Sequence, residues 1–311
     1  MSLQQIRARP LQSEEDFWRV HRLLSETYPV TPLGLNWDVR RWEGMRFYDE
    51  NTRWPSPRLA GRAQLWETTA GQLVGAVFPE GMGDAHLQVH PNFRYIEPAM
   101  TAWAEEHLTA PTQEGRRQLA ILVYEYDIPR RHLLAERGYA KSDAGGVVRR
   151  LRLASHPLLE PTAPTGYTLR TTNPADLDDC QRIADLLNAA FNRTFHTAAE
   201  YRNFTQLAPS FRQELDLVMQ APDGTLAAYV GIPYDKANHR GIFEPVCTHP
   251  AHRQHGLAKA LMLAGLRRLF ALGGREATVE TGLMIPANRL YDSIGFTEVY
   301  QGDIWRRAFV A

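Results

Sequence analysis

The fold is decided by residues 243–261, which read FEPVCTHPAHRQHGLAKAL. The start of this stretch belongs to an apolar, β-prone run, GIFEPVCT (241–248), of the kind that forms a buried strand. Pro250 ends the run, and residues 257–272 show the apolar periodicity of a helix. A strand, a turn containing Gly256 and a helix are therefore expected in direct succession.

Such a turn is suited to binding an anion. The first backbone N–H groups of a helix have no intrahelical partner, and the helix dipole adds partial positive charge at the same end. Gly256 would let a phosphate approach where a Cβ would block it. The alternative is an ordinary strand–turn–helix with an incidental glycine.

The composition is that of a globular protein with two domains of ordinary size. The chain has 311 residues, of which 44% are hydrophobic and 23% charged. A formal net charge of zero argues against nucleic acid or an anionic membrane as the main partner. The N-terminus has no apolar signal core, no apolar run reaches 18 residues, and Cys180 and Cys247 do not make a disulfide framework. We expect a cytoplasmic protein.

The two halves of the chain repeat one order of elements. In the first half we expect helices at 14–28, 97–107 and 129–137, and strands at 63–68, 72–78, 86–89, 118–126 and 147–153. In the second half we expect helices at 176–191, 257–272 and 286–293, and strands from 169, at 214–220, 226–233, 241–248, 276–281 and 298–306. The proline-rich segment 154–166 has no periodicity and is expected to be a linker.

Local motifs keep a nearly constant offset between the halves. Val89-His90-Pro91 precedes Thr248-His249-Pro250 by 159 residues, and Arg137-Gly138-Tyr139 precedes Ile294-Gly295-Phe296 by 157 residues. Two unrelated domains would not keep this register. The sequence therefore predicts two copies of one α/β fold, in domains 1–153 and 167–311.

Two motifs of the second half resemble those of the GNAT superfamily of acyl-CoA-dependent N-acetyltransferases. They are RQHGLA at 253–258, on the strand–helix turn, and LYDSIGF at 290–296, on a later helix. The resemblance covers residues 166–311 well and the first half only by architecture, and the tandem layout is similar to that of mycothiol synthase and other double-GNAT proteins. It implies an α/β fold with mixed sheets, two tandem GNAT-type domains with a degenerate N-terminal copy, and an acyltransferase that uses acetyl-CoA as co-substrate.

The resemblance also implies where acetyl-CoA binds. The pyrophosphate would lie on backbone N–H groups of the turn, with two cations nearby, which assigns to it Arg253, Gln254, His255, Gly256, Leu257, Ala258 and Lys259. GNAT proteins splay the preceding strand from the next one, so the backbone of Val246, Cys247 and Thr248 would pair with the pantetheine. One N–H there would polarise the thioester carbonyl.

Glu244 and Tyr291 are the expected catalytic residues. An ammonium with a pKa near 10 must lose a proton before it attacks, which costs about 4 kcal/mol at neutral pH. Glu244, six residues before the motif proline as in several family members, would accept that proton. Tyr291 would return a proton to the departing CoA thiolate. The alternatives are a Glu244 that only solvates a strand edge and a Tyr291 that is a core aromatic.

Three further features of the second half could be taken for functional sites. Asn288 lies where it could contact CoA, although the family's asparagine usually stands at the position of Met284; alternatively, Asn288 bonds its own backbone. We expect no metal at His249, His252 and His255, because no carboxylate or cysteine stands at ligand spacing. Cys247 is interpreted as a buried strand residue, not a nucleophile.

The first copy lacks the features that define the second. Ala85 stands in place of Glu244, Leu134 in place of Tyr291, and Glu97, followed by Pro98, in place of Gly256. A carboxylate at the turn would repel pyrophosphate, and proline has no N–H to donate. We expect that this copy does not bind acyl-CoA in the usual manner and that it supports the catalytic copy.

The acceptor is expected to be a primary amine of a small molecule. The acceptor side of the family is built from the first two helices, whose aromatic residues suggest a partly apolar amine: Phe191, Phe195, His196, Tyr201 and Phe204. Neither nucleic acid nor membrane is expected as a partner, and the chain could be a monomer or a homodimer. Two other readings stay open: a non-catalytic acyl-CoA-binding or regulatory protein, and a peptide or protein N-acetyltransferase.

Overall fold

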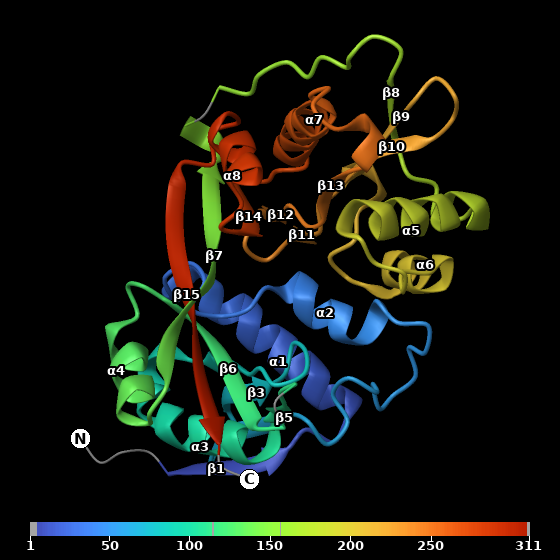
Figure 1. The fold of residues 1–311 in the computed structure, drawn as a ribbon. Helices are drawn as coiled ribbons and strands as arrows, with labels where there is room; N and C mark the ends of the chain where they lie inside the picture. The colour runs from blue at the N-terminus through green and yellow to red at the C-terminus, as the bar shows by residue number, and fades with distance from the viewer. Residues whose placement is uncertain (1–4, 114, 156, 310–311) are drawn as a thin grey trace. The chain divides into compact units, whose positions relative to one another are not determined.

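The computed structural model describes residues 5–113, 115–155 and 157–309, which form two compact units (Figure 1). Unit 1 contains the described residues of 1–46, 53–147 and 300–311, and unit 2 contains residues 47–52 and the described residues of 148–299. No helix in the described ranges is long and apolar enough to cross a membrane.

The first half of the chain provides most of unit 1. Its elements are β1 (Ile6–Pro10), α1 (Glu14–Thr27), η1 (Tyr28–Val30), α2 (Val39–Phe47), β2 (Gln64–Thr68), β3 (Leu73–Phe78), β4 (His86–Val89), η2 (Pro91–Ile96), α3 (Glu97–His107), β5 (Ala110–Pro111), β6 (Arg117–Tyr124), α4 (Ile128–Glu136) and β7 (Ala140–Arg152). Helix α2 lies in a tryptophan- and arginine-rich stretch for which the periodicity predicted no helix. Strands β1, β2, β3 and β4 form one antiparallel sheet in that order.

The second half repeats this order in unit 2. Its elements are η3 (Leu153–Ser155), β8 (Thr168–Thr171), α5 (Leu177–Phe191), α6 (Ala198–Leu207), η4 (Gln213–Leu215), β9 (Asp216–Gln220), β10 (Leu226–Gly231), β11 (Tyr234–Asp235), β12 (Arg240–Ile242), β13 (Val246–Thr248), η5 (Pro250–His252), α7 (Leu257–Ala271), β14 (Glu276–Gly282), α8 (Ile285–Asp292) and β15 (Glu298–Phe309). Strands β8, β9, β10 and β13 form the matching sheet.

The pairing register of the two sheets is the same. Leu65 lies opposite Ala76 in unit 1, and Val218 lies opposite Tyr229 in unit 2, at an offset of 153 on both strands. A register shift interrupts both hairpins at equivalent positions, between Trp66 and Glu67 on one side and between Leu226 and Ala228 on the other. Because a bulge is specific to one register, this agreement supports duplication of one fold.

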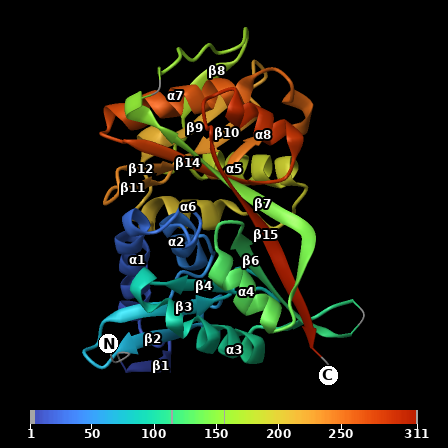
Figure 2. The ribbon, with the colours of Figure 1, turned by 90° about the vertical axis from the view of Figure 1, so that its left-hand side faces the viewer.

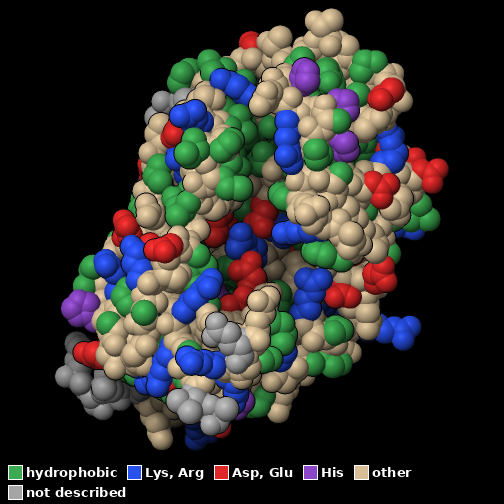
Figure 3. All heavy atoms as spheres, viewed as in Figure 1, with side chains coloured by type: hydrophobic (Ala, Val, Ile, Leu, Met, Phe, Trp, Pro, Cys, Tyr) green, Lys and Arg blue, Asp and Glu red, His purple; other side chains and the backbone are tan. Residues whose placement is uncertain are grey.

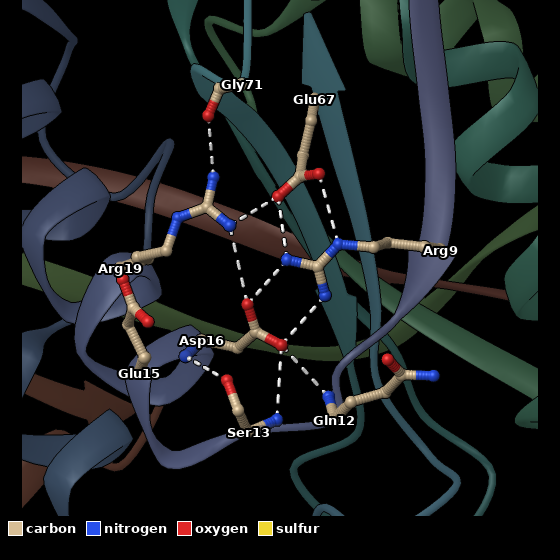
Figure 4. A pocket seen from close by; sticks show the side chains of 8 residues that line it. All are labelled: Arg9, Gln12, Ser13, Glu15, Asp16, Arg19, Glu67 and Gly71. Carbon is tan, nitrogen blue, oxygen red and sulfur yellow. Dashed lines mark hydrogen bonds and ion pairs between the residues drawn. The ribbon is translucent and has the colours of Figure 1, made fainter.

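An ion-pair network is also repeated, and it lines a pocket of unit 1 (Figure 4). Arg9 bonds Asp16 and Glu67, while Arg19 bonds Glu67 and the carbonyl of Gly71. In unit 2, Arg170 bonds Asp179 and Gln220, while Arg182 bonds the carbonyl of Gly224. Both networks tie a first strand to a helix and a hairpin. Since Arg9 and Arg19 are already paired with Asp16 and Glu67, we interpret the network as a structural feature and not as a ligand site.

The last strand of each half is placed beside a strand of the other half. Strand β7 lies next to β14, and β15 lies next to β6, with Gly302 opposite Tyr124 and Phe309 opposite Arg117. Figures 1 and 2 show β7 and β15 as long strands that run side by side. The division into units therefore differs from the bounds 1–153 and 167–311 suggested by the sequence, because residues 148–153 belong to unit 2 and residues 300–309 to unit 1.

Helix α7 anchors the core of unit 2. Its buried side chains include Leu261, Met262 and Leu266, which pack in a cluster with apolar residues of β9, β10 and β14. Tyr291 and Phe296, at and after the end of α8, belong to the same cluster. One core therefore holds both α7, which follows the turn at 253–258, and the segment 290–296.

Candidate active site

The sequence predicted one strand at 241–248, but the structure interrupts it at Glu244 and Pro245. The interruption shapes the candidate site. Strand β12 pairs in parallel with β14, and the N–H of Phe243 still donates to the carbonyl of Thr278 at 2.8 Å. Strand β13 pairs instead with β10, in the other sheet. Proline has no N–H to continue the ladder with β14. The chain therefore passes from one sheet to the other at Glu244–Pro245, and β13 is splayed from β14.

This path leaves one side of β13 open. The carbonyl of Pro245 accepts from the N–H of Gly231 at 3.1 Å, and the N–H of His249 donates to the carbonyl of Ala227 at 2.9 Å. Because alternate residues of an antiparallel strand bond to the same side, the N–H and C=O groups of Val246 and Thr248 point to the other side. β13 is also the edge strand of its sheet. An extended chain of amides could pair there.

The turn before α7 presents a row of backbone donors. The first hydrogen bond of the helix runs from the N–H of Ala260 to the carbonyl of Gly256 at 3.0 Å, and no side chain caps the helix. No other described residue accepts from the N–H groups of residues 254–259. Gln254 and Gly256 have φ of 67° and 76°, in the left-handed region. The predicted residues of the turn are thus arranged as an anion-binding site requires.

Two basic side chains and a recess accompany this turn. Arg253 donates to the carbonyl of Ala190 at 3.0 Å and reaches the carbonyl of Thr248 at 3.5 Å, so it spans α5 and β13. Lys259 lies in the first turn of α7. Figure 3 shows a recess in the upper part of the visible face, within unit 2, with hydrophobic side chains around it.

Glu244 and Tyr291, the expected base and acid, lie within electrostatic reach of each other. Tyr291 is 5% exposed. Burial raises the pKa of its hydroxyl to about 12; Arg149 opposes this rise, and Cys247 and Glu244 add to it. The hydroxyl makes no hydrogen bond with another described residue. Tyr291 is therefore a protonated donor at neutral pH. Glu244 is half-buried, and its N–H donates to the carbonyl of Gly231 at 3.0 Å.

Arg149 is a site residue that the motifs did not reveal. This buried side chain of β7 bonds the side chain of Asn288 at 2.9 Å, the side chain of Asp292, and the carbonyl of Phe296 at 3.1 Å. Its three partners flank Tyr291, so Arg149 fixes the helix that carries the expected acid. The available signal was an arginine that follows the apolar pair Val147-Val148 in a strand.

Asn288 has a local role in the structure. Its side-chain nitrogen donates to the carbonyls of Gly282 at 3.1 Å and Met284 at 2.9 Å, and its oxygen accepts from Arg149. This pattern matches the alternative of an asparagine that bonds nearby backbone. A contact between Asn288 and CoA stays a prediction.

Each of the three histidines at the turn has a hydrogen-bond partner within the protein. His249 accepts from the N–H of Ala251 at 3.2 Å, His252 bonds the hydroxyl of Tyr167 at 3.0 Å, and His255 faces the carbonyl of His252. Among the described residues, no group of three His, Cys, Asp or Glu side chains could hold a metal ion. Burial raises the pKa of the Cys247 thiol to about 12, so it is not a thiolate at neutral pH.

The aromatic residues expected on the acceptor side separate into two groups. Phe191 and Phe195 are exposed, and the guanidinium of Arg193 lies over both rings. Tyr201 and Phe204 are buried, so these two rings do not offer an open apolar surface to an amine. His196 bonds the side chain of Glu200 at 2.6 Å.

The equivalent region of unit 1 is filled by its own ion pairs. Glu97, at the position of Gly256, is 3% exposed and bonds Arg94 at 2.5 Å and Arg130 at 2.8 Å. Burial opposes ionisation of Glu97, but Arg130 and Arg94 together hold its pKa below the usual range. Arg94, the counterpart of Arg253, also pairs with Asp127 at 2.6 Å. The protein's own carboxylate thus occupies the place where unit 2 presents free donors.

This geometry, with a strand splayed from its neighbour and an open helix N-terminus beside it, is accompanied by a likeness to known folds. The chain is similar to a GCN5-related N-acetyltransferase of Sphaerobacter thermophilus, with a TM-score of 0.68, 20% identity, and coverage of 97% of this chain and 95% of that one. It is also similar to a tandem GNAT protein from the clavulanic acid biosynthesis pathway, with a TM-score of 0.69, 19% identity and 98% coverage of both chains. At these identities the likeness establishes the tandem GNAT fold.

The sequence of unit 2 is also similar to a known family. Residues 180–296 match the model of the acetyltransferase (GNAT) family. A search of curated protein sequences found no match. The chain therefore has the tandem GNAT fold, and part of its second copy is similar to the acetyltransferase (GNAT) family.

Proposed function

We propose that the protein is an N-acetyltransferase that moves the acetyl group of acetyl-CoA to a primary amine of a small molecule, by direct attack in a ternary complex. The observation that carries this proposal is the break at Glu244–Pro245. It separates β13 from β14 and opens the edge of β13, beside the unbonded N–H groups of residues 254–259.

Each part of acetyl-CoA has a counterpart in this arrangement. The N–H groups of the turn bind the pyrophosphate, and Arg253 and Lys259 add positive charge. The outward N–H and C=O groups of Val246 and Thr248 pair with the pantetheine amides. An N–H of the same edge donates to the thioester oxygen and stabilises the negative charge that develops during attack.

The reaction follows from the two side chains near the thioester. Glu244 accepts a proton from the ammonium, directly or through water, and the free amine attacks the thioester carbon. The C–N bond forms, the C–S bond breaks, CoA leaves as a thiolate, and the new amide nitrogen loses its second proton to water. With a pKa of about 12, Tyr291 favours donating a hydrogen bond to the departing sulfur over complete proton transfer, which would be uphill by about 5 kcal/mol against an ordinary thiol.

The direct test is CoA release from acetyl-CoA, followed with a thiol reagent across a panel of amines. The panel contains aminoglycosides, amino acids, amino sugars, polyamines and lysine peptides. Release that depends on a small amine, with a product heavier by one acetyl group, supports the proposal. Tight binding of acetyl-CoA without turnover would indicate a regulatory acyl-CoA-binding protein, and turnover confined to peptides would indicate a peptide or protein N-acetyltransferase.

A further inference from the structure

A buried carboxylate with three hydroxyl partners lies behind the candidate active site. Asp216, at the start of β9, is 3% exposed. Its Oδ1 accepts from the hydroxyl of Tyr229 at 2.7 Å, and its Oδ2 accepts from the hydroxyls of Tyr201 and Thr172, each at 2.5 Å. These partners come from β10, α6 and the residue after β8. We call these four residues the Asp216 cluster.

The cluster touches the point where the chain changes sheets. Gly231 lies opposite Asp216 in the β9–β10 ladder. A Cβ on Gly231 would lie 2.9 Å from the hydroxyl of Tyr229, 3.3 Å from Oδ1 of Asp216 and 3.3 Å from Cδ of Pro245. The backbone of Gly231 also bonds the N–H of Glu244 and the carbonyl of Pro245. Gly231 therefore joins the cluster directly to the Glu244–Pro245 segment.

The first copy provides an internal control for this cluster. The N–H of Thr172 donates to the carbonyl of Asp216 at 2.9 Å, and the N–H of Leu11 donates to the carbonyl of Ala63 at 3.0 Å. Leu11 and Ala63 are therefore the counterparts of Thr172 and Asp216. The strand register likewise makes Ala76 the counterpart of Tyr229. Tyr201 and Trp42 each bond the carbonyl of the residue four before them, at the start of α6 and α2. The counterparts of the cluster are therefore apolar and buried: Leu11, Trp42, Ala63 and Ala76.

This difference shows that the fold does not require the cluster. A carboxylate removed from water loses hydration that hydrogen bonds only partly replace, and well-packed apolar residues are often as stabilising or more so. By contrast, Asp179, which is also buried, has a counterpart in Asp16 that makes the equivalent ion pair. A buried carboxylate present in both copies serves the fold. One present only in the copy with Glu244, Gly256 and Tyr291 is a candidate for a role in the chemistry of that copy.

We propose that Asp216 is a positioning residue of the acyl-transfer site. Through Tyr229 and Gly231 it holds the Glu244–Pro245 segment, which places the Glu244 carboxylate and the open edge of β13 relative to the thioester. This inference rests on the proposed function. It assigns Asp216 no contact with substrate.

The test compares Asp216→Asn and Tyr229→Phe with the control Asp179→Asn. Three quantities are measured: kcat with an active amine, Kd for acetyl-CoA, and hydrogen–deuterium exchange of the peptide that covers 243–248. Misplacement of a reacting group by about 1 Å costs up to roughly 100-fold in rate. We expect kcat to fall about 10- to 100-fold in both cluster variants, Kd to stay within about twofold, and exchange at 243–248 to accelerate. Asp179→Asn should lower Tm but leave kcat per folded molecule and this exchange unchanged.

Unchanged kcat and exchange in the cluster variants would overturn the proposal, as would equal changes in Asp179→Asn. Tyr229→Phe removes a single hydroxyl and keeps the test decisive if Asp216→Asn does not fold. If the wild-type protein turns over no amine, the proposed function fails. The exchange measurement then still decides the positioning role: faster exchange at 243–248 supports it and unchanged exchange overturns it.

Discussion

Equivalent residues of the two copies differ where the chemistry is expected. Glu244 corresponds to Ala85, and Tyr291 to Leu134. Leu134 and Tyr291 occupy equivalent positions in the two copies. The N–H of Tyr139 donates to the carbonyl of Leu134 at 2.9 Å, and the N–H of Phe296 donates to the carbonyl of Tyr291 at 3.1 Å. The two copies thus have the same backbone conformation at these positions, but only the second has the reactive side chains. This makes the first copy a reference against which each proposed residue of the second can be tested.

Glu244→Gln should separate catalysis from cofactor binding. The amide cannot accept the ammonium proton, so kcat/KM for the amine should fall by about 10²- to 10⁴-fold. The loss should be largest at low pH, where the amine is protonated, and Kd for acetyl-CoA should stay nearly unchanged. A pH series of initial rates with calorimetric binding checks this. The exposed Glu214→Gln is the control, and equal rates in all three proteins would refute the role of Glu244.

Tyr291→Phe should lower kcat by about 10- to 100-fold at every pH from 6 to 10. Its hydroxyl has a pKa of about 12, so it stays protonated throughout this range and adds no inflection to the rate profile. Because the hydroxyl bonds no other described residue, the variant should unfold at the same temperature as the wild type or slightly higher. Scanning calorimetry and a pH–rate profile measure both effects. An unchanged kcat would leave Tyr291 as a core aromatic.

At the scale of elements, the N-terminus of α7 and the edge of β13 make up the surface that we propose for acetyl-CoA. The helix begins at Leu257 directly after a left-handed glycine, and residues 254–259 keep their N–H groups available. In unit 1 the equivalent helix α3 begins at Glu97, which is buried in ion pairs. The same strand–turn–helix is open to an anion in one copy and closed by a carboxylate in the other.

Gly256→Glu should abolish binding of acetyl-CoA. A Cβ at Gly256 meets no atom within 4 Å, so the effect comes from the negative charge and from the left-handed φ of 76°. Gly273→Glu, at the other end of α7, is the control, because Gly273 has a φ of 87° and equally open space. It measures the backbone strain of about 1–2 kcal/mol without placing a charge at the turn. Calorimetric titration should show binding by Gly273→Glu only. Retained affinity in Gly256→Glu would mean that the turn is not the phosphate site.

At the scale of the whole molecule, strand exchange makes the second copy depend on the first half of the chain. Strand β7 comes from the first half, yet its residue Arg149 belongs to unit 2 and bonds Asn288 and Asp292 of α8 and the carbonyl of Phe296 beyond it. A copy that we expect not to bind acyl-CoA can therefore still contribute to the activity proposed for the second. The contacts of Arg149 with α8 are one way in which the first half of the chain supports the second copy.

Arg149→Met should weaken both stability and turnover. Loss of its charged hydrogen bonds should lower the free energy of unfolding by about 2–3 kcal/mol, and release of α8 should lower kcat without changing Kd for acetyl-CoA. The neighbouring Arg150→Met is the control, since Arg150 pairs with Glu298 and Glu276 instead of α8. Chemical denaturation and steady-state kinetics measure the two effects. Equal kinetics in both variants would contradict the role of Arg149.

Calorimetric titration of the full chain should give one acetyl-CoA per chain. Unit 1 has Glu97 where the pyrophosphate would lie, and Arg94 is already paired with Glu97 and Asp127. A stoichiometry of two would show that this ion-pair network opens to admit a second cofactor.

Much of the fold and of the candidate site could be predicted because it is encoded locally. The offsets of 159 and 157 revealed the repeat, and RQHGLA and LYDSIGF carried the GNAT resemblance. Helix α2 was missed because its apolar periodicity is weak, and the interruption at Glu244–Pro245 was missed because 241–248 is β-prone throughout. The bond between Asn288 and Arg149 could not be predicted, because Arg149 lies 139 residues away in the chain.

The sequence by itself determined the duplication, the turn at 253–258 and the identity of Glu244 and Tyr291 as candidates. The turn and the helix starts are properties of neighbouring residues, the duplication follows from the repeated order of elements, and the two candidates and the splay of the strand rest on the GNAT resemblance. Only the tertiary structure decided the point at which the chain changes sheets, the contacts of Arg149 with α8 and the Asp216 cluster beside Gly231. These depend on contacts between residues far apart in the chain, which form only when the sheets and helices of each unit pack.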